Sequence, residues 1–249
     1  MSQLPPPLTP LPKLDAQLAA TGYAVLDAES LALLANVALP ALAAWTGCWD
    51  DLPLDSYLRD GGRYRQRRHS CFIVAGDGVR QVPHRAHWQP LDYNALHGGL
   101  QRWFEPMHPA MADDPAWSSL LLGLAARAST LRDRPGPWYV EAHPFRIDTS
   151  DGIGRPTPEG AHRDGVDLVA VILVGRQAIK GGETRVFDAH GPQGLRFTLT
   201  EPWSALLLDD TRVVHESTPI QPLQADGHGH RDTLVLTFRH GGFQGPVSE

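Results

Sequence analysis

The sequence predicts an α+β fold in which helices precede an antiparallel β-sandwich or jelly roll. Helical periodicity is concentrated before residue 133, and short strand-like runs dominate after Gly136. The chain also holds 24 Gly and 22 Pro, as expected where many short strands are joined by tight turns. With 249 residues, 42% of them hydrophobic, it can bury a sizeable core, and β-rich domains of this length are commonly single.

Three segments of the N-terminal half have the hydrophobic spacing of helices. Residues 14–20 fit a short helix, and residues 29–45 fit a longer one that Pro40 should kink or break. The strongest pattern covers residues 114–132, where Asp114 precedes a proline and is a suitable N-cap. We therefore expect N-terminal helices to flank the β-rich core.

Short runs rich in Val, Ile, Leu, Phe and Thr make up most of the C-terminal half. Their spacing is typical of a sandwich or jelly roll rather than of alternating β-α units. The predicted strands lie at residues 23–26, 63–74, 137–148, 165–175, 183–188, 195–200, 204–208, 212–215 and 231–239. Residues 1–12 hold five prolines and are expected to form a flexible arm, which leaves residues 13–249 as a single domain.

The composition argues against several classes of function. A net charge of −6 gives no broad basic surface for nucleic acid. The most apolar stretch, residues 31–45, is too short to span a bilayer, and the N-terminus lacks the pattern of a signal peptide. Cys48 and Cys71 are too few for a disulfide framework. We therefore expect a cytoplasmic protein with reduced thiols that binds neither nucleic acid nor a membrane.

The tripeptide His162-Arg163-Asp164 places an imidazole and a carboxylate two positions apart. In an extended strand, such residues project from the same face. One imidazole and one carboxylate are two thirds of a 2-His-1-carboxylate facial triad, which holds Fe(II) and leaves three coordination positions open. His215 is the best candidate for the third ligand, because the chain between it and Asp164 is long enough for the strands that return across a jelly roll.

A receptor for a dicarboxylate is predicted on the strand that follows His215. Arg231 and Thr233 share a face by the same period-two argument. A guanidinium pairs bidentately with a carboxylate and a hydroxyl adds a hydrogen bond, so this pair suits the distal carboxylate of 2-oxoglutarate. The alternative is that Arg231 only pairs with an acid such as Asp232 at the surface, in which case Arg239 is the second candidate anchor.

His143 and the arginines near residue 65 are weaker candidates. His143 either faces the barrel interior or is a hydrogen-bonded core residue. Arg63, Arg65 and Arg67 share one strand face, where one of them could clamp a substrate carboxylate; a solvated edge strand protected by charge is an equal alternative. The histidines that give no independent signal are His69, His84, His87, His97 and His108.

Several motifs together resemble the bacterial 2-oxoglutarate/Fe(II)-dependent dioxygenases. They are HRDG from residue 162, GGETRVFD from residue 181, DDTRVVHESTPI from residue 209 and RDTLVLTF from residue 231. The runs YLRDGGRYRQRR from residue 57 and QPLDYNALHGGLQRWFEP from residue 89 make the sequence most similar to the subfamily of L-isoleucine 4-hydroxylase and the biofilm-stress-motility protein BsmA. The likeness spans about residues 20–240. One departure is that Arg231 lies 16 positions after His215, beyond the common spacing.

The resemblance implies a double-stranded β-helix (jelly-roll, cupin-like) core, Fe(II) as cofactor and 2-oxoglutarate as cosubstrate. It also implies O2 as the oxidant and a free L-amino acid or similar small carboxylate as the substrate. Decarboxylation of 2-oxoglutarate would yield succinate and drive hydroxylation of a C–H bond. Because Asp164 is present, no coordination position is vacated for a halide, which favours hydroxylation over halogenation. Gln89, Asn94 and Arg102 are candidate site residues through this resemblance alone.

Two other functions remain open at this point. A non-catalytic barrel would bind a small carboxylate as a sensor or stress-response protein, although a pure binder has no need for a redox-metal site. A zinc-loaded, cupin-like hydrolase would use the same three ligands. That hydrolase leaves the predicted 2-oxoglutarate anchor unexplained.

Overall fold

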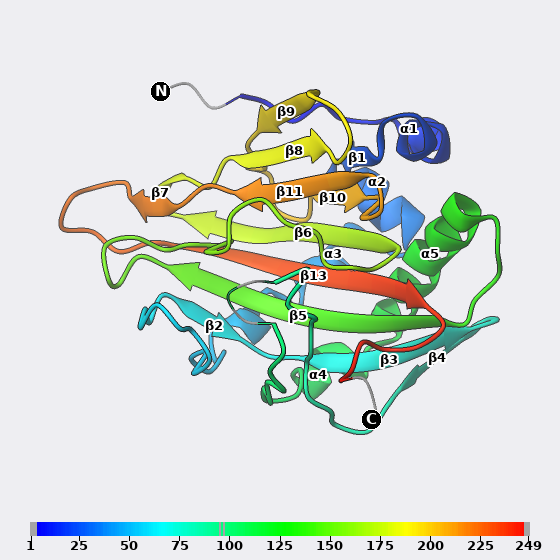
Figure 1. The fold of residues 1–249 in the computed structure, drawn as a ribbon, viewed down its shortest axis with the longest axis horizontal. Helices are drawn as coiled ribbons and strands as arrows, with labels where there is room; N and C mark the ends of the chain where they lie inside the picture. The colour runs from blue at the N-terminus through cyan, green and yellow to red at the C-terminus, as the bar shows by residue number, and fades with distance from the viewer. Residues whose placement is uncertain (1–3, 95, 97, 247–249) are drawn as a thin grey trace.

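A large antiparallel sheet runs across the molecule, and a smaller sheet packs on one of its faces (Figure 1). The computed structural model describes residues 4–94, 96 and 98–246. The large sheet has the strand order β1-β10-β6-β13-β5-β3-β4, with β2 paired to β5, and the small sheet has the order β11-β8-β9. Strands β7 and β12 form a separate pair. This arrangement confirms the predicted α+β, jelly-roll fold.

The strands are β1 (Tyr23–Leu26), β2 (Arg65–Arg67), β3 (Ser70–Ala75), β4 (Gly78–Gln81), β5 (Trp138–Asp148), β6 (Leu168–Gln177), β7 (Ile179–Gly181), β8 (Thr184–Asp188), β9 (Gly194–Phe197), β10 (Ala205–Leu208), β11 (Val213–Ser217), β12 (Ile220–Pro222) and β13 (His230–His240). The helices are η1 (Leu11–Lys13), α1 (Leu14–Thr21), α2 (Ala28–Leu34), α3 (Leu39–Ala43), η2 (Thr46–Trp49), α4 (Pro109–Ala112) and α5 (Pro115–Arg132).

Helices cover the face of the large sheet that lies away from the small sheet. The main hydrophobic core joins residues of α1, α2, α3 and α5 to one face of β3, β5, β6, β10 and β13. Helix α5 begins where the sequence analysis expected, because the Asp114 carboxylate accepts a hydrogen bond from the backbone N–H of Ala116 at 2.8 Å. The helical layer leaves the opposite face of the sheet for the small sheet and for a pocket.

The central strands bury side chains on both faces of the large sheet. In β6, Leu168, Ala170 and Ile172 point into the helical core. Val169 and Leu173 point the other way, into a second core between the two sheets. Burial on both faces explains why this strand is a nearly continuous apolar run and not an alternating one.

Strands β5 and β13 pair along their whole length, from His230 opposite Asp148 to His240 opposite Trp138. Their even-numbered residues supply the helical core through Trp138, Val140, Ala142, Leu234, Leu236 and Phe238. Their odd-numbered residues line a pocket on the opposite face through Tyr139, Glu141, His143, Phe145, Ile147, Arg231, Thr233, Val235, Thr237 and Arg239. The period of two therefore separates a packing face from a functional face on the same two strands.

The structure differs from the predicted elements in several places. The expected helix 29–45 is two helices, α2 and α3, and Pro40 lies in the first turn of the second helix, where its missing N–H is not needed. The expected strand 63–74 is divided into β2 and β3. Strands β4, β7 and β12 were not predicted, because each is short and holds a single Val or Ile, in the sequences GVRQ, IKG and IQP.

The described part of the N-terminal arm lies beside β1 and the small sheet. The backbone N–H of Thr9 donates to the carbonyl of Val25 at 2.7 Å, and that of Thr198 donates to the carbonyl of Leu4 at 2.9 Å. Residues 1–3 of the predicted arm lie outside the described residues. Within the part of the chain that the structure describes, no single helix has the length and apolar composition of a membrane span; residues 28–34 and 39–49 meet those criteria together as a pair bent by 99°.

Candidate functional site

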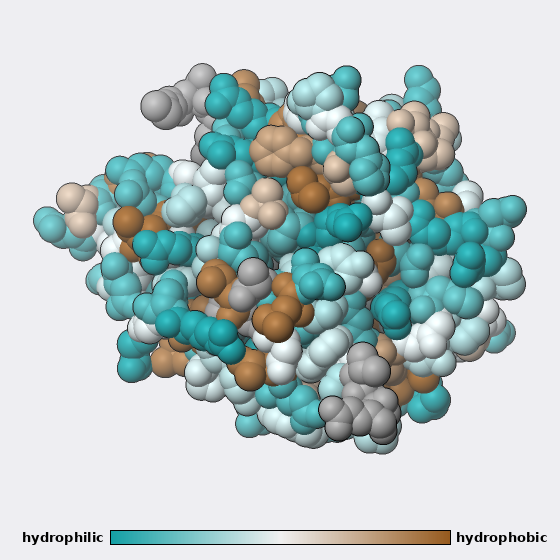
Figure 2. All heavy atoms as spheres, viewed as in Figure 1, coloured by the Kyte–Doolittle hydropathy of each residue, from teal (hydrophilic) through white to brown (hydrophobic). Residues whose placement is uncertain are grey.

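The pocket lies on the face of β5 and β13 that is turned away from the helices. The loop between β4 and α4 contributes His87, Gln89, Asn94 and Arg102 to its wall. The face of the molecule seen in Figure 1 is mostly hydrophilic, with a compact hydrophobic group near the centre of the view (Figure 2). Exposed apolar side chains of the same loop are Leu91, Leu96, Leu100 and Trp103.

His162 and His215 face each other across a short backbone bridge. The N–H of His162 donates to the carbonyl of His215 at 3.1 Å, and the N–H of His215 donates to the carbonyl of His162 at 3.0 Å. Their ring centroids are 4.6 Å apart. His215 lies in β11, but His162 forms only an isolated bridge and residues 162–164 are not the strand that the sequence analysis expected.

Asp164 completes a cluster of three candidate metal ligands. One ligand atom each from His162, Asp164 and His215 can be chosen so that all lie within 4.8 Å of one another. Nδ1 of His162 is 2.9 Å from the Gly160 carbonyl, a contact that places the ring proton on Nδ1 and leaves the Nε2 lone pair free. Two imidazoles and one carboxylate are the donors that Fe(II) takes in a facial triad, so these residues fit an iron ion.

The electrostatics of this cluster also suit a bound cation. Burial raises the pKa of the Asp164 carboxyl. Burial also holds the pKa of His215 well below its usual value, with His162 adding to the effect, so that this imidazole is neutral. Burial opposes the charged form of His162 as well, but the Asp164 and Glu159 carboxylates raise its pKa. A divalent ion would stabilise the Asp164 carboxylate and displace the proton from His162.

Asp210 is a site residue that the sequence analysis missed. Its carboxylate accepts hydrogen bonds from the backbone N–H groups of Asp164 at 3.0 Å, Gly165 at 2.7 Å and Val166 at 3.0 Å. Gly165 has a φ of +75°, so the chain turns sharply directly after Asp164. Burial and the nearby Asp164 charge raise the pKa of Asp210 to about 7. Asp210 therefore fixes the backbone that carries one candidate ligand.

Gln89 holds the Asp164 side chain from the other direction. Its Nε2 donates to Oδ1 of Asp164 at 3.1 Å. Its Oε1 accepts from Nδ2 of Asn94 at 3.1 Å and from Nη2 of Arg102 at 2.9 Å. The three residues that the resemblance singled out thus form one hydrogen-bonded group against a candidate ligand.

Arg231 is buried in the pocket wall without a carboxylate partner. It is 3% exposed, and among the described residues its Nε and Nη2 have no hydrogen-bond partner. Burial and the adjacent Arg176 lower its pKa to about 10, against the opposing effect of Asp232. Asp232 itself binds Arg146 through two hydrogen bonds of 2.8 Å, which overturns the alternative of a surface pair with Arg231.

A second group of buried guanidinium groups lies in the same pocket. Arg65 and Arg67 are 5% and 3% exposed, which overturns the alternative of a solvated edge strand, whereas Arg63 is exposed. Arg65 donates to Asp55 at 2.8 Å. Arg102 is also buried, and burial lowers its pKa to about 10.

His143 lines the pocket and is also a buried, hydrogen-bonded residue, so it combines the two positions considered for it. It belongs to a cluster that the sequence analysis did not predict. The other members are His69, His87 and Glu141, all buried. Burial lowers the pKa of His69 and lowers that of His87 to about 3. Burial opposes ionisation of Glu141, but its interactions with His87 and His69, both of which donate hydrogen bonds to it, lower its pKa. The cluster therefore combines neutral imidazoles with an ionised carboxylate.

Fold and pocket together define a jelly-roll protein that can hold a metal ion beside an anion. A model of the 2OG-Fe dioxygenase family matches residues 46–237. The chain belongs to this family and is an Fe(II)- and 2-oxoglutarate-dependent dioxygenase. The two alternatives left open by the sequence, a non-catalytic barrel and a zinc hydrolase, are thereby disfavoured.

Several solved structures have a similar fold. A BsmA homologue from Methylobium petroleophilum is 54% identical, with 96% of this chain and 97% of that chain covered and a TM-score of 0.91. IDO from Bacillus thuringiensis is 16% identical, with coverages of 94% and 100% and a TM-score of 0.75. The dioxygenase TqaL is 19% identical, with coverages of 96% and 90% and a TM-score of 0.72. The last two show likeness of fold alone. The search of curated proteins returned no match.

Proposed function

We propose that His162, Asp164 and His215 hold the Fe(II) of this dioxygenase, and that Arg231 and Thr233 bind the distal carboxylate of 2-oxoglutarate. The observation that carries the proposal is that the three candidate ligands line one pocket with Arg231, whose Nε and Nη2 have no hydrogen-bond partner among the described residues. Bound Fe(II) and 2-oxoglutarate supply the oxidising chemistry that couples decarboxylation to hydroxylation. We further propose that residues 13–249 act as one domain.

The protein contributes binding and exclusion of water. Arg231 in β13 lies opposite Arg176 in the neighbouring strand β6. Their adjacent positive charges attract a dicarboxylate. The pocket wall also includes Val171, Val235 and Phe243, which are apolar. An apolar wall keeps water from the reacting carbon and strengthens the charge interactions within the pocket.

We propose a free L-amino acid, or a similar small carboxylate, as the substrate. The support is the second buried cationic group, because Arg67 and Arg102 line the pocket in addition to the proposed 2-oxoglutarate anchor. A guanidinium that has lost its water gains most from a carboxylate partner.

Screening the twenty amino acids for coupled succinate formation tests this function. The protein is loaded with Fe(II) and 2-oxoglutarate without oxygen, each candidate is added, and air is then admitted. We expect at least one amino acid to raise succinate release far above the rate without substrate, with a product heavier by one oxygen atom. Stimulation only by small carboxylates that lack an amino group would exclude amino acids, and absence of stimulation by either kind of compound would overturn the proposal.

Replacement of Arg231 by alanine should raise the 2-oxoglutarate concentration needed for half-maximal rate. Loss of a charge-assisted pair costs about 1.5–3 kcal/mol, or roughly 10- to 100-fold in affinity. Arg239→Ala is the matched control, because that guanidinium lies on the same strand face but donates to the Gly242 carbonyl at 2.6 Å. An unchanged requirement in Arg231→Ala, together with a raised one in Arg239→Ala, would transfer the anchor to Arg239.

A further inference from the structure

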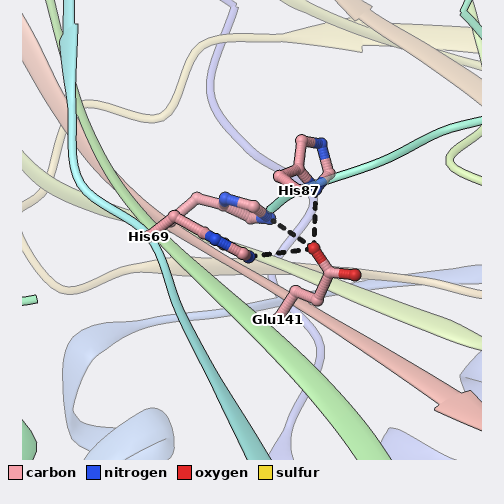
Figure 3. Close-up of side chains that lie close together, drawn as sticks. His69, His87 and Glu141 are labelled. Atoms are coloured by element: carbon pink, nitrogen blue, oxygen red, sulfur yellow. Dashed lines mark hydrogen bonds and ion pairs between the residues drawn. The ribbon is translucent and has the colours of Figure 1, made fainter. Parts of the chain in front are cut away.

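We propose that His69, His87 and Glu141 form a second binding site for a divalent transition-metal ion, separate from the proposed iron ligands. The three side chains come from different parts of the chain and converge on one point (Figure 3). His69 directly precedes β3, His87 lies in the loop after β4, and Glu141 lies in β5. Their convergence places two imidazoles around one carboxylate oxygen.

The three side chains are joined by two hydrogen bonds, in which each imidazole donates to the same oxygen of the Glu141 carboxylate, and a bound ion would displace both protons from these nitrogens. Oε2 of Glu141 lies 3.0 Å from Nε2 of His69 and 2.6 Å from Nδ1 of His87. Ligand atoms of these three residues and His143 all lie within 4.8 Å of one another, the same limit that the cluster of His162, Asp164 and His215 meets. All members of the second cluster are buried.

His143 is excluded as a ligand by its hydrogen bond with Arg67. The guanidinium donates from Nη2 to Nδ1 of His143 at 2.7 Å. Because Arg67 keeps Nδ1 as an acceptor, the ring proton of His143 must stay on Nε2, which leaves no lone pair for a metal. In His69, by contrast, Nδ1 has no hydrogen-bond partner among the described residues and can take the proton that an ion displaces from Nε2. His143 instead stacks on His69 at 4.7 Å between ring centroids. The remaining set is two histidines and one carboxylate.

The open side of this set faces the shared pocket. His87 and Glu141 both line it. Glu141 supplies only one negative charge and Arg67 is close to the cluster, so a divalent ion needs a further anion from the pocket, such as hydroxide or a carboxylate. Imidazole and carboxylate donors suit zinc, cobalt and iron(II), and three protein ligands with an open position are typical of ions that bind an exogenous ligand.

Metal stoichiometry tests the proposal without measuring turnover. The protein is loaded with excess Zn(II) or Co(II), passed through a desalting column, and analysed for metal per chain by mass spectrometry. We expect two ions in the wild type, one in His162→Ala, one in His87→Ala and none in the double variant. His84→Ala, an exposed histidine of the same loop, should keep two.

Glu141→Gln provides a second variant of nearly the same shape in case His87→Ala does not fold, and it should also hold one ion. Near-UV circular dichroism checks the fold of each variant. One ion in the wild type, or two ions in both His87→Ala and Glu141→Gln, would overturn the second site. Failure of the proposed iron site gives a different result, because His162→Ala would then lose no ion.

Discussion

Replacement of Asp164 by alanine is expected to abolish substrate-dependent succinate formation while the chain remains folded. The variant removes the only carboxylate of the proposed triad, which leaves two neutral imidazoles for the iron. Loss of a residue that merely supports a metal ligand typically costs 10- to 100-fold, so loss of the ligand itself should cost more than about 100-fold in turnover.

Iron retention and succinate release, measured on the same preparation, check this result. Asp226→Ala is the control, because Asp226 is an exposed carboxylate outside the pocket lining. Burial raises the pKa of Asp164, so its removal relieves a desolvation cost in the absence of metal. The iron-free variant should thus unfold at a similar or higher denaturant concentration than the iron-free wild type. Full turnover in Asp164→Ala would remove this residue from the metal site.

The pattern of alternate residues could predict which side chains share one face of a strand. Arg231 and Thr233 were placed on one face from their spacing alone, and the structure has them in one pocket wall on β13. That inference works because the side-chain period of a strand is two regardless of its partners. The same argument brought His162 and Asp164 together although residues 162–164 are not a strand. There, the backbone bridge to His215 and the contacts of Asp210 set the geometry.

The histidine cluster could not be found from spacing, because its members meet only through the sheet. Glu141 and Cys71 are opposite each other across β5 and β3, and His69 lies two residues before that pair. Twelve histidines in the chain give no means of selecting His69 and His87 without knowledge of this register. The charged residues of β2 were also hard to interpret from the sequence. A strand with alternating arginines is typical of a solvated edge, but Arg65 and Arg67 are buried, and Arg65 forms an ion pair with Asp55.

Asp210→Ala is expected to weaken iron binding and to lower the free energy of unfolding, although Asp210 is not a proposed ligand. The variant leaves the backbone N–H groups of Asp164, Gly165 and Val166 without their acceptor. A buried donor without a partner costs about 1–3 kcal/mol, and loss of a residue that orients a ligand costs roughly 10- to 100-fold in metal affinity. We therefore expect a destabilisation of about 3 kcal/mol together with that loss of affinity.

Asp210→Asn separates the two contributions. The amide oxygen of the introduced asparagine can still accept from one or two of the N–H groups, but its NH2 group faces a donor. The free energy of unfolding and the iron affinity of Asp210→Asn should therefore lie between those of the wild type and of Asp210→Ala. The matched control is Asp188→Ala, because Asp188 accepts a backbone N–H from His190 at 2.8 Å in an exposed turn outside the pocket. Unfolding by urea without metal and an anaerobic Fe(II) titration measure the two quantities. If Asp210→Ala binds iron as tightly as Asp188→Ala, the position of Asp164 depends on Gln89 and not on the carboxylate beneath its backbone.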